Sequence, residues 1–153
     1  MQGADNQQER LALLGYIAGI LDGEAWLGIA VTKRTDVRAG FILEPMISVH
    51  MVGKAWIEHL DHVVKQVGLP SYYVHRPTSS HWQLRGYRRT VPFLETIHPY
   101  LFIKRQQAEI MLELARTRKE RHHHSSPTEA DMELVARIRA LNTKGKNPQR
   151  LYA

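Results

Sequence analysis

The sequence predicts an α+β fold in which helices pack on one face of a four-stranded antiparallel sheet. Segments with apolar residues at helical spacing alternate with two pairs of segments in which apolar and polar residues alternate one by one. Each pair is joined by a polar connection, as in an antiparallel hairpin with one buried and one exposed face. The order is helix, hairpin, helix, hairpin and then helices, which favours one layer of helices on one sheet.

Composition narrows the class of protein. The chain has 153 residues, enough for one domain with a substantial core, and its 43% hydrophobic content is that of a soluble globular protein. The absence of cysteine excludes disulfides, thiolate zinc sites and cysteine nucleophiles. A net charge of +6 indicates a polyanionic partner. Nucleic acid fits better than a membrane surface, since no basic amphipathic anchor or lipidation signal is found, and we expect no membrane contact.

The first helix is predicted at residues 9–21, after a polar and flexible stretch at residues 1–8. Gly15, Gly19 and Gly23 recur at four-residue intervals and therefore lie near one stripe of the helix surface. Each glycine inside a helix costs about 0.5–1 kcal/mol relative to alanine, and close approach of another backbone is the usual reason for accepting that cost. Because the helix ends in Asp22 and Glu24, we interpret it as the centre of a metal site.

The helix has two other interpretations. A membrane or signal helix is excluded because the apolar run is too short and stops in two acids. An ordinary amphipathic core helix with solvated acids remains open, although it leaves the repeated glycines unexplained.

Period-two alternation predicts the strands, which lie at residues 26–32, 41–50, 72–76 and 81–88. In the first hairpin Leu27 and Ile47 belong to the buried parity, and in the second Trp82 and Leu84 face the core. The turn of the second hairpin is predicted at residues 77–80.

Apolar residues at helical spacing predict four further helices, at residues 52–67, 91–100, 104–118 and 127–142. Gly68 is a typical C-terminal cap for the first of them, and Trp56 is predicted to face the core. The last helix follows a charged linker at residues 119–124, and Ser126, Pro127 and Glu129 form its predicted capping box. The domain is thus predicted at residues 9–142, with a basic tail at residues 143–153.

The uncovered face of the sheet is predicted to be polar and cationic, like a ribbon that reads base edges in a major groove. The alternative is an ordinary solvated sheet face. The predicted DNA-contacting residues are Thr32, Arg34, Arg38, Ser48, His50, His75, Arg76, His81, Gln83 and Arg85, together with Lys144 and Lys146 in the tail.

Residues 17–25, Ile-Ala-Gly-Ile-Leu-Asp-Gly-Glu-Ala, resemble the signature of the LAGLIDADG homing endonucleases. Residues 97–108, Ile-His-Pro-Tyr-Leu-Phe-Ile-Lys-Arg-Gln-Gln-Ala, look like the second characteristic stretch of that family. The predicted order of elements also agrees, so the resemblance covers residues 11–141. It implies a saddle-like four-stranded sheet and the site-specific hydrolysis of double-stranded DNA.

The single copy of the motif implies a homodimer that cuts near-palindromic DNA, because family members with two motifs act as monomers. The implied dimer interface consists of Gly15, Ala18, Gly19 and Asp22. Protein two-fold symmetry then requires a target of two half-sites.

The resemblance also assigns the chemistry. Glu24 matches the metal-binding acid, with Gly23 beside it, and implies Mg²⁺ or Mn²⁺ as cofactor. Asp22 matches an acid that supports the site, and Lys104 matches a basic residue near the cleaved phosphate. Glutamate at position 24 and Ala25 depart from the usual aspartate and glycine. A residue that holds the attacking water follows the second strand, and His50 and its neighbours are the candidates.

Two alternatives remain at this stage: a maturase of the same fold that binds intron RNA, and a non-catalytic DNA-binding regulator. Retained acids at positions 22 and 24 favour the nuclease. An intracellular, intron-encoded enzyme of this type occurs in archaea, bacteria and organelles, and the sequence does not select among them.

Overall fold

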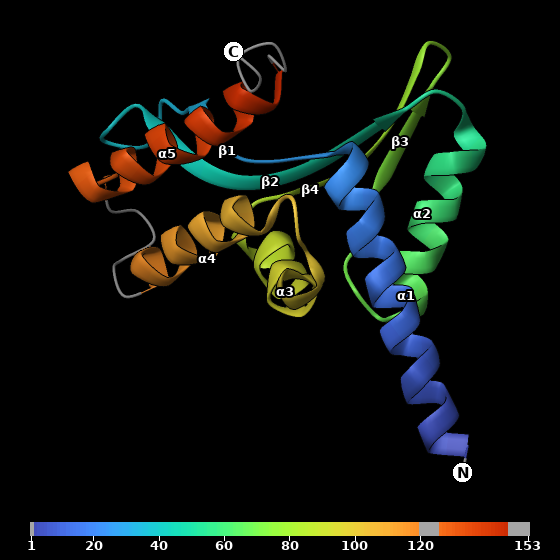
Figure 1. The fold of residues 1–153 in the computed structure, drawn as a ribbon. Coiled ribbons are helices and arrows are strands. Elements are labelled where there is room, and N and C mark those ends of the chain that lie inside the picture. The colour runs from blue at the N-terminus through green and yellow to red at the C-terminus, as the bar shows by residue number, and fades with distance from the viewer. Residues whose placement is uncertain (1, 120–125, 147–153) are drawn as a thin grey trace.

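A computed structural model describes residues 2–119 and 126–146. It has the predicted α+β architecture, with helices packed against a curved four-stranded sheet (Figure 1). In chain order the elements are α1 (Gln2–Glu24), β1 (Ala25–Lys33), β2 (Phe41–Met51), α2 (Lys54–Gln66), β3 (Tyr73–Arg76), β4 (Ser79–Arg85), α3 (Tyr87–Ile97), the 3₁₀ turn η1 (His98–Tyr100), α4 (Arg105–Lys119) and α5 (Glu129–Lys146). Among the described helices, none has the length and apolar character needed to cross a bilayer.

The sheet has the strand order β1-β2-β4-β3, and each neighbouring pair is antiparallel. Leu27, Ile47 and Leu84 pair across the three longer strands and are all completely buried. Because paired residues share a face, this row marks the side of the sheet that the helices cover. The opposite side carries the alternate residues of each strand, which are more polar.

Helices far apart in the sequence complete the core over that buried row. Leu60 of α2, Phe93 of α3 and Met111 of α4 are at most 1% exposed and join the same apolar cluster. The last helix is fixed to the edge strand by a side chain, because Asn142 Nδ2 of α5 donates to the carbonyl of Leu27 at 2.9 Å. In contrast, the first half of α1 extends past the other helices (Figure 1).

A buried chain of hydrogen bonds joins α2 to the sheet. The indole N–H of Trp82 donates to Ser71 Oγ at 2.7 Å, and Ser71 Oγ donates in turn to Asp61 Oδ1 at 2.6 Å. The other oxygen of Asp61 accepts from Lys65 at 2.8 Å. Asp61 is 7% exposed and Trp82 is fully buried, so the carboxylate and the indole N–H are largely desolvated and depend on their partners.

Several helix boundaries differ from the prediction. α1 begins at Gln2 and includes the stretch that was expected to be flexible. α3 begins at Tyr87, directly after Gly86, which adopts a positive φ of 87°. α5 continues to Lys146, so the tail expected from residue 143 begins inside a helix. The predicted linker lies almost entirely outside the described residues.

Of the two predicted helix caps, one is confirmed and one is wrong. Gly68 has φ 79° and donates to the carbonyl of Lys65, while Leu69 donates to that of Val64, which confirms the predicted C-terminal cap of α2. The capping box predicted at Ser126 and Glu129 is wrong. The capping box is formed by Thr128 and Asp131 instead. Thr128 Oγ1 accepts a hydrogen bond from the backbone N–H of Asp131 at 3.1 Å, and the Asp131 carboxylate accepts one from the backbone N–H of Thr128 at 2.9 Å.

The buried hydrogen-bond chain gives the first prediction. Ser71→Ala removes the atom that joins Trp82 to Asp61 and leaves both groups without that partner. We expect a loss of about 1–3 kcal/mol in the free energy of unfolding. Urea denaturation followed by tryptophan fluorescence measures it. Lys54→Ala is the control, because Lys54 forms only an exposed ion pair with Glu58 and its loss costs about 1 kcal/mol or less.

Candidate active site and nucleic-acid interface

The carboxylate of Asp22 holds together two parts of the chain that are far apart in sequence. Its two oxygens accept the backbone N–H groups of Phe102 and Lys104, each at 2.9 Å. These residues belong to the segment between η1 and α4. Both oxygens are therefore engaged within the chain, and the carboxylate fixes the start of α4 to the end of α1.

The side chain of Lys104 also contacts the region where α1 ends. Its Nζ donates to the carbonyl of Ala25, the first residue of β1. Burial lowers the pKa of Lys104 below its ordinary value, and the nearby carboxylates of Asp22 and Glu24 act in the opposite direction. The structure therefore brings the predicted basic residue to the end of α1.

Glu24 is the last residue of α1 and is exposed. Within the described residues its carboxylate forms neither a hydrogen bond nor an ion pair, so its oxygens are available. The carboxyl end of a helix carries partial negative charge and unpaired carbonyls, here including the predicted ligand residue Gly23. Both features favour a bound cation at this point.

The described residues of one chain offer a small set of donors for a metal ion at the end of α1. Across residues 2–119 and 126–146, no group of three or more acidic or histidine side chains is arranged to hold an ion. The donor set is one free carboxylate with backbone carbonyls beside it. That set suits Mg²⁺, which is usually held by one or two carboxylates together with waters and substrate phosphates.

The glycines of α1 form an open stripe. Gly15, Gly19 and Gly23 are exposed, and a Cβ atom built on any of them meets nothing within 4 Å. No contact among residues 2–119 and 126–146 therefore requires glycine at these positions. Ala18, predicted to lie in the same interface, is fully buried in the core, and that part of the prediction is wrong.

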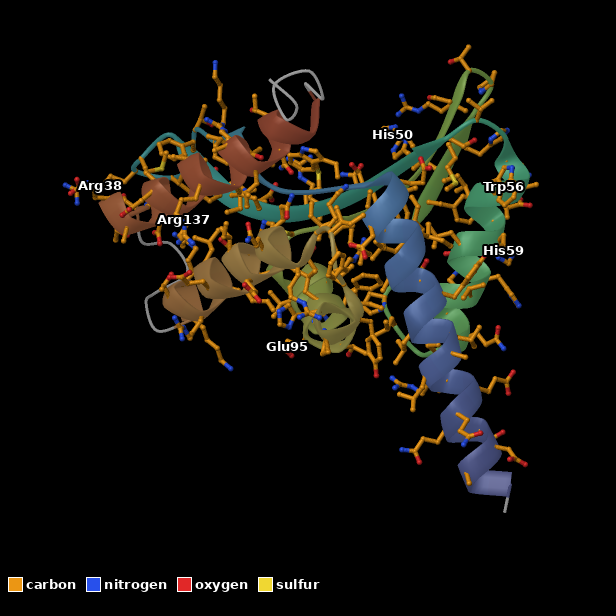
Figure 2. All side chains as sticks on the ribbon, viewed as in Figure 1. Arg38, His50, Trp56, His59, Glu95 and Arg137 are labelled. Atoms are coloured by element: carbon orange, nitrogen blue, oxygen red, sulfur yellow. The ribbon has the colours of Figure 1, made fainter. Side chains whose placement is uncertain are left out.

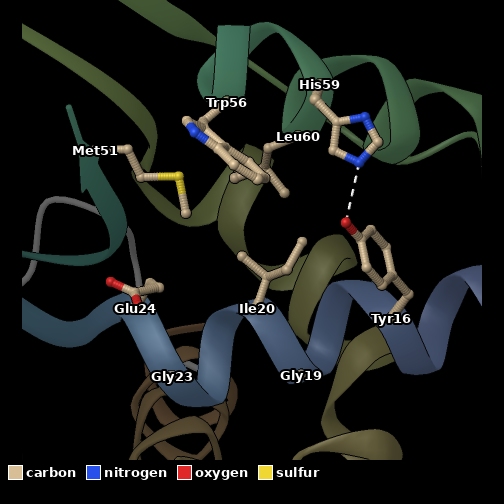
Figure 3. Close-up of a pocket in the computed structure, with 9 residues that line it drawn as sticks. All are labelled: Tyr16, Gly19, Ile20, Gly23, Glu24, Met51, Trp56, His59 and Leu60. Atoms are coloured by element: carbon tan, nitrogen blue, oxygen red, sulfur yellow. Dashed lines mark hydrogen bonds between the residues drawn. The ribbon is translucent and has the colours of Figure 1, made fainter. Parts of the chain in front are cut away.

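An apolar groove of about 400 Å³ runs beside this stripe, between α1 and α2 (Figure 3). At one end of the groove the Tyr16 hydroxyl and His59 Nε2 share a hydrogen bond of 3.0 Å, and Glu24 lies at the other end. Trp56 was predicted to be buried but is 62% exposed on the wall of the groove. Beyond α1, Phe102 and Ile103 are 85% and 64% exposed, a feature that the sequence analysis missed.

The open face of the sheet carries five of the twelve predicted DNA-contacting residues. Thr32, Gln83 and Arg85 share it, and His50 pairs with His81, with their ring centroids 5.3 Å apart. Burial, followed by the charges of His50 and Arg76, lowers the pKa of His81. His50 follows Val49, the residue of β2 that pairs with Ala25 at the start of β1.

Two residues predicted on this face are not available there. Ser48 is only 6% exposed, and Trp26, which lies opposite it, covers Gly28 so closely that a Cβ at Gly28 would overlap the indole ring. His75 pairs with Ser80 and bonds to its buried hydroxyl at 2.6 Å, which places it on the helix side of the sheet.

The remaining predicted residues lie around the edges of the open face. Arg76 is exposed at the end of β3, and Arg34 in the β1–β2 loop pairs with Asp36, whose hydrogen bonds and charge raise the pKa of Arg34. Arg38 is exposed in the same loop (Figure 2). Lys144 and Lys146 lie on the last turn of α5, but their side chains are outside the described part of the structure.

A hydrogen-bonded group on the open face was not predicted from the sequence. Glu44 Oε2 accepts from Arg85 Nε at 2.6 Å and from Thr32 Oγ1 at 3.1 Å, and Arg85 Nη2 donates to Thr32 Oγ1 at 2.8 Å. The signal was present, because Glu44 has the same strand parity as His50. Parity alone did not reveal that three strands would bring these side chains together.

Comparison with known proteins agrees with the architecture. The homing endonuclease I-CvuI, solved with a DNA target, matches with a TM-score of 0.70 and 18% identity over 87% of this chain and 83% of its own. The archaeal intron-encoded homing endonuclease I-Vdi141I, also solved with DNA, gives 0.69 and 15% over 84% and 82%. The chain has the LAGLIDADG homing endonuclease fold.

A third comparison concerns length. I-SmaMI, a meganuclease solved with DNA, matches with a TM-score of 0.63 and 14% identity over 86% of this chain but only 44% of its own. The LAGLIDADG fold of this chain thus spans less than half of that protein. No family model matches the sequence, and no curated protein has a significant match to it.

The two acids of α1 give the second prediction. Asp22→Asn replaces one acceptor oxygen with an amide NH₂ group. That group cannot accept the backbone N–H it would face, so we expect a loss of about 1–3 kcal/mol in the free energy of unfolding. Glu24→Gln leaves every described contact intact and is expected to change that free energy by about 0.5 kcal/mol or less. Urea denaturation of both variants compares them. Equal losses would contradict the positioning role of Asp22.

Proposed function

We propose that this protein is a site-specific DNA endonuclease that acts as a homodimer and requires a divalent cation. The observation that carries the proposal is the exposed carboxylate of Glu24 near the Lys104 ammonium, at the point where α1 leads directly into β1. An exposed acid with hard oxygen ligands, a cation and a polar reading surface are the parts that phosphodiester hydrolysis needs.

Double-stranded DNA is the proposed partner. The net charge of +6 supports a polyanion, and Arg85, Gln83 and His81 offer hydrogen-bonding groups on one twisted ribbon. I-CvuI and I-Vdi141I, which share the fold, were both solved with DNA. I-CvuI was solved in the presence of magnesium and of calcium, which supports a divalent cation here.

A second copy of the chain is proposed to cover the glycine stripe. Gly15 and Gly19 let two α1 helices approach closely, and the apolar groove, with Trp56 on its wall, provides surface to bury. The length of I-SmaMI supports this proposal, because this chain matches less than half of it. Pairing along α1 would bring two Glu24 carboxylates to one site.

Each residue then has a defined role in hydrolysis. Glu24 from each subunit, together with the carbonyl of Gly23, would hold Mg²⁺ or Mn²⁺, which when bound polarises the phosphate and activates water. Lys104 stabilises the negative charge that develops as a water oxygen bonds to phosphorus and the bond to the leaving sugar oxygen breaks. Asp22 positions Lys104, and His50 orients the attacking water.

The third prediction tests the acid. Wild-type protein incubated with Mg²⁺ and a library of plasmids carrying randomised inserts should linearise some members, and EDTA should prevent it. Glu24→Gln should abolish linearisation while retaining binding to the selected sequences in a gel-shift assay. Glu9→Gln on the exposed start of α1 is the matched control and should cut normally. Cutting by Glu24→Gln would refute the assignment, and binding without any cutting by the wild type would indicate a DNA-binding regulator.

The fourth prediction concerns Lys104. Lys104→Met removes the cation but keeps an unbranched side chain, and we expect the cleavage rate to fall by roughly 10²–10³-fold. DNA affinity should change little, because a single ammonium near the reacting phosphate contributes little to an interface with many phosphate contacts. Single-turnover cleavage and fluorescence anisotropy measure the two quantities separately. A fall in affinity equal to the fall in rate would contradict the role.

The fifth prediction concerns assembly. Gly19→Ala should stabilise the single chain by about 0.5–1 kcal/mol, since a Cβ there meets nothing and alanine favours helix. The same substitution should weaken the dimer by separating the two helices. Sedimentation equilibrium gives the dimer constant, and denaturation at low concentration gives the stability. Gly3→Ala, on the same helix and equally open, should leave the dimer constant unchanged. Unchanged dimerisation of Gly19→Ala would exclude this interface.

A further inference from the structure

The four strands contain one acidic residue, and it faces the open side of the sheet. Glu44 is the single Asp or Glu in β1, β2, β3 and β4. A carboxylate on a surface that meets phosphates is repelled by the partner, so its presence among cationic groups requires a physical reason.

Part of the reason is the local geometry. Glu44 Oε2 accepts from both Arg85 Nε and Thr32 Oγ1, and Arg85 Nη2 completes the ring by donating to Thr32 Oγ1. Three neighbouring strands thereby fix one edge of the guanidinium. A fixed arginine loses less conformational freedom when it binds, so its remaining donors are preorganised.

The groups left over are complementary to a base pair. Arg85 Nη1 and Glu44 Oε1 form no hydrogen bond among the described residues, and both side chains retain exposed area, 46% and 21% respectively. An arginine donates to the acceptors of guanine in the major groove, and a carboxylate accepts from the N4 amine of cytosine. The two groups left over are therefore a donor and an acceptor on two side chains that are hydrogen-bonded to each other.

We propose that Arg85 and Glu44 together read one G·C base pair in each half-site, with Arg85 donating to guanine and Glu44 accepting from the amine of its paired cytosine. The inference rests on the proposed function, because it requires that the open face meets DNA. The carboxylate is retained against electrostatic cost since it gives the face selectivity at this position.

The experiment begins with selection of duplexes from a randomised pool by the wild-type protein, in EDTA so that nothing is cut. The selected sequences should contain a G·C pair at one position in each half-site. Arg85→Lys should lose that preference, by roughly 5- to 150-fold in relative affinity, and keep the preferences elsewhere. Failure of the wild type to select any sequence would count against the proposed function itself.

A base analogue then separates direct contact by Glu44 from mere support of Arg85. Replacing the cytosine by 2-pyrimidinone removes only its exocyclic amine. The analogue should weaken wild-type binding at least about fivefold more than it weakens binding by Glu44→Met, which has no acceptor. Glu58→Met on α2 is the matched control and should behave as the wild type, because Glu58 pairs with Lys54 on a helix.

Two results would overturn the inference. Equal weakening of all three proteins by the analogue would mean that Glu44 does not contact the amine. A lost preference in Arg85→Lys at one base pair and in Glu44→Met at another would mean that the two side chains do not read one pair. Circular dichroism and thermal melting of each variant establish that the fold is intact in every comparison.

Discussion

The site depends on the two hydrogen bonds that Asp22 accepts. They join residues separated by 80 and 82 positions, and so fix the segment before α4 to the end of α1. Lys104 closes the arrangement by donating to Ala25 at the start of β1. The end of one helix, the start of a strand and the start of another helix are thereby held as one unit. The ammonium of Lys104 is consequently held near the carboxylate of Glu24, although the two residues lie far apart in the sequence.

The spacing of the two acids explains why they differ. Residues two apart in an α-helix point about 200° from one another, so Asp22 and Glu24 cannot share a face. Asp22 lies on the side of Ala18, four residues earlier, which is fully buried. Glu24 lies on the open side. The motif therefore supplies two different acids. Asp22 forms hydrogen bonds with the segment before α4, and the carboxylate of Glu24 is exposed and forms no hydrogen bond among the described residues. The same geometry explains the failed prediction for Ala18, which precedes the open Gly19 by only one residue but by about 100°.

Much of the fold could be predicted because parity and periodicity are local properties of the sequence. The buried row Leu27, Ile47 and Leu84 follows directly from alternation. His75 was misplaced because its face depends on the register of the hairpin, in which His75 pairs with Ser80 and Val74 pairs with His81. Trp56 was misplaced because its helical spacing is typical of a core position in a single chain. The roles of Glu24 and Lys104 came from the family resemblance, and no pattern of charge would have paired them.

The exposed surface of α1 has an energetic consequence. Three open glycines cost a lone chain about 1.5–3 kcal/mol relative to alanine, and no contact within the described residues offsets that cost. Exposed Trp56 and Phe102 add apolar area that water disfavours. If a second copy covers this surface, both costs are relieved only on assembly, and the measured stability depends on protein concentration. The element that carries the free acid is then also the element whose stability is coupled to the partner, so folding, pairing and formation of the metal site are linked through one helix.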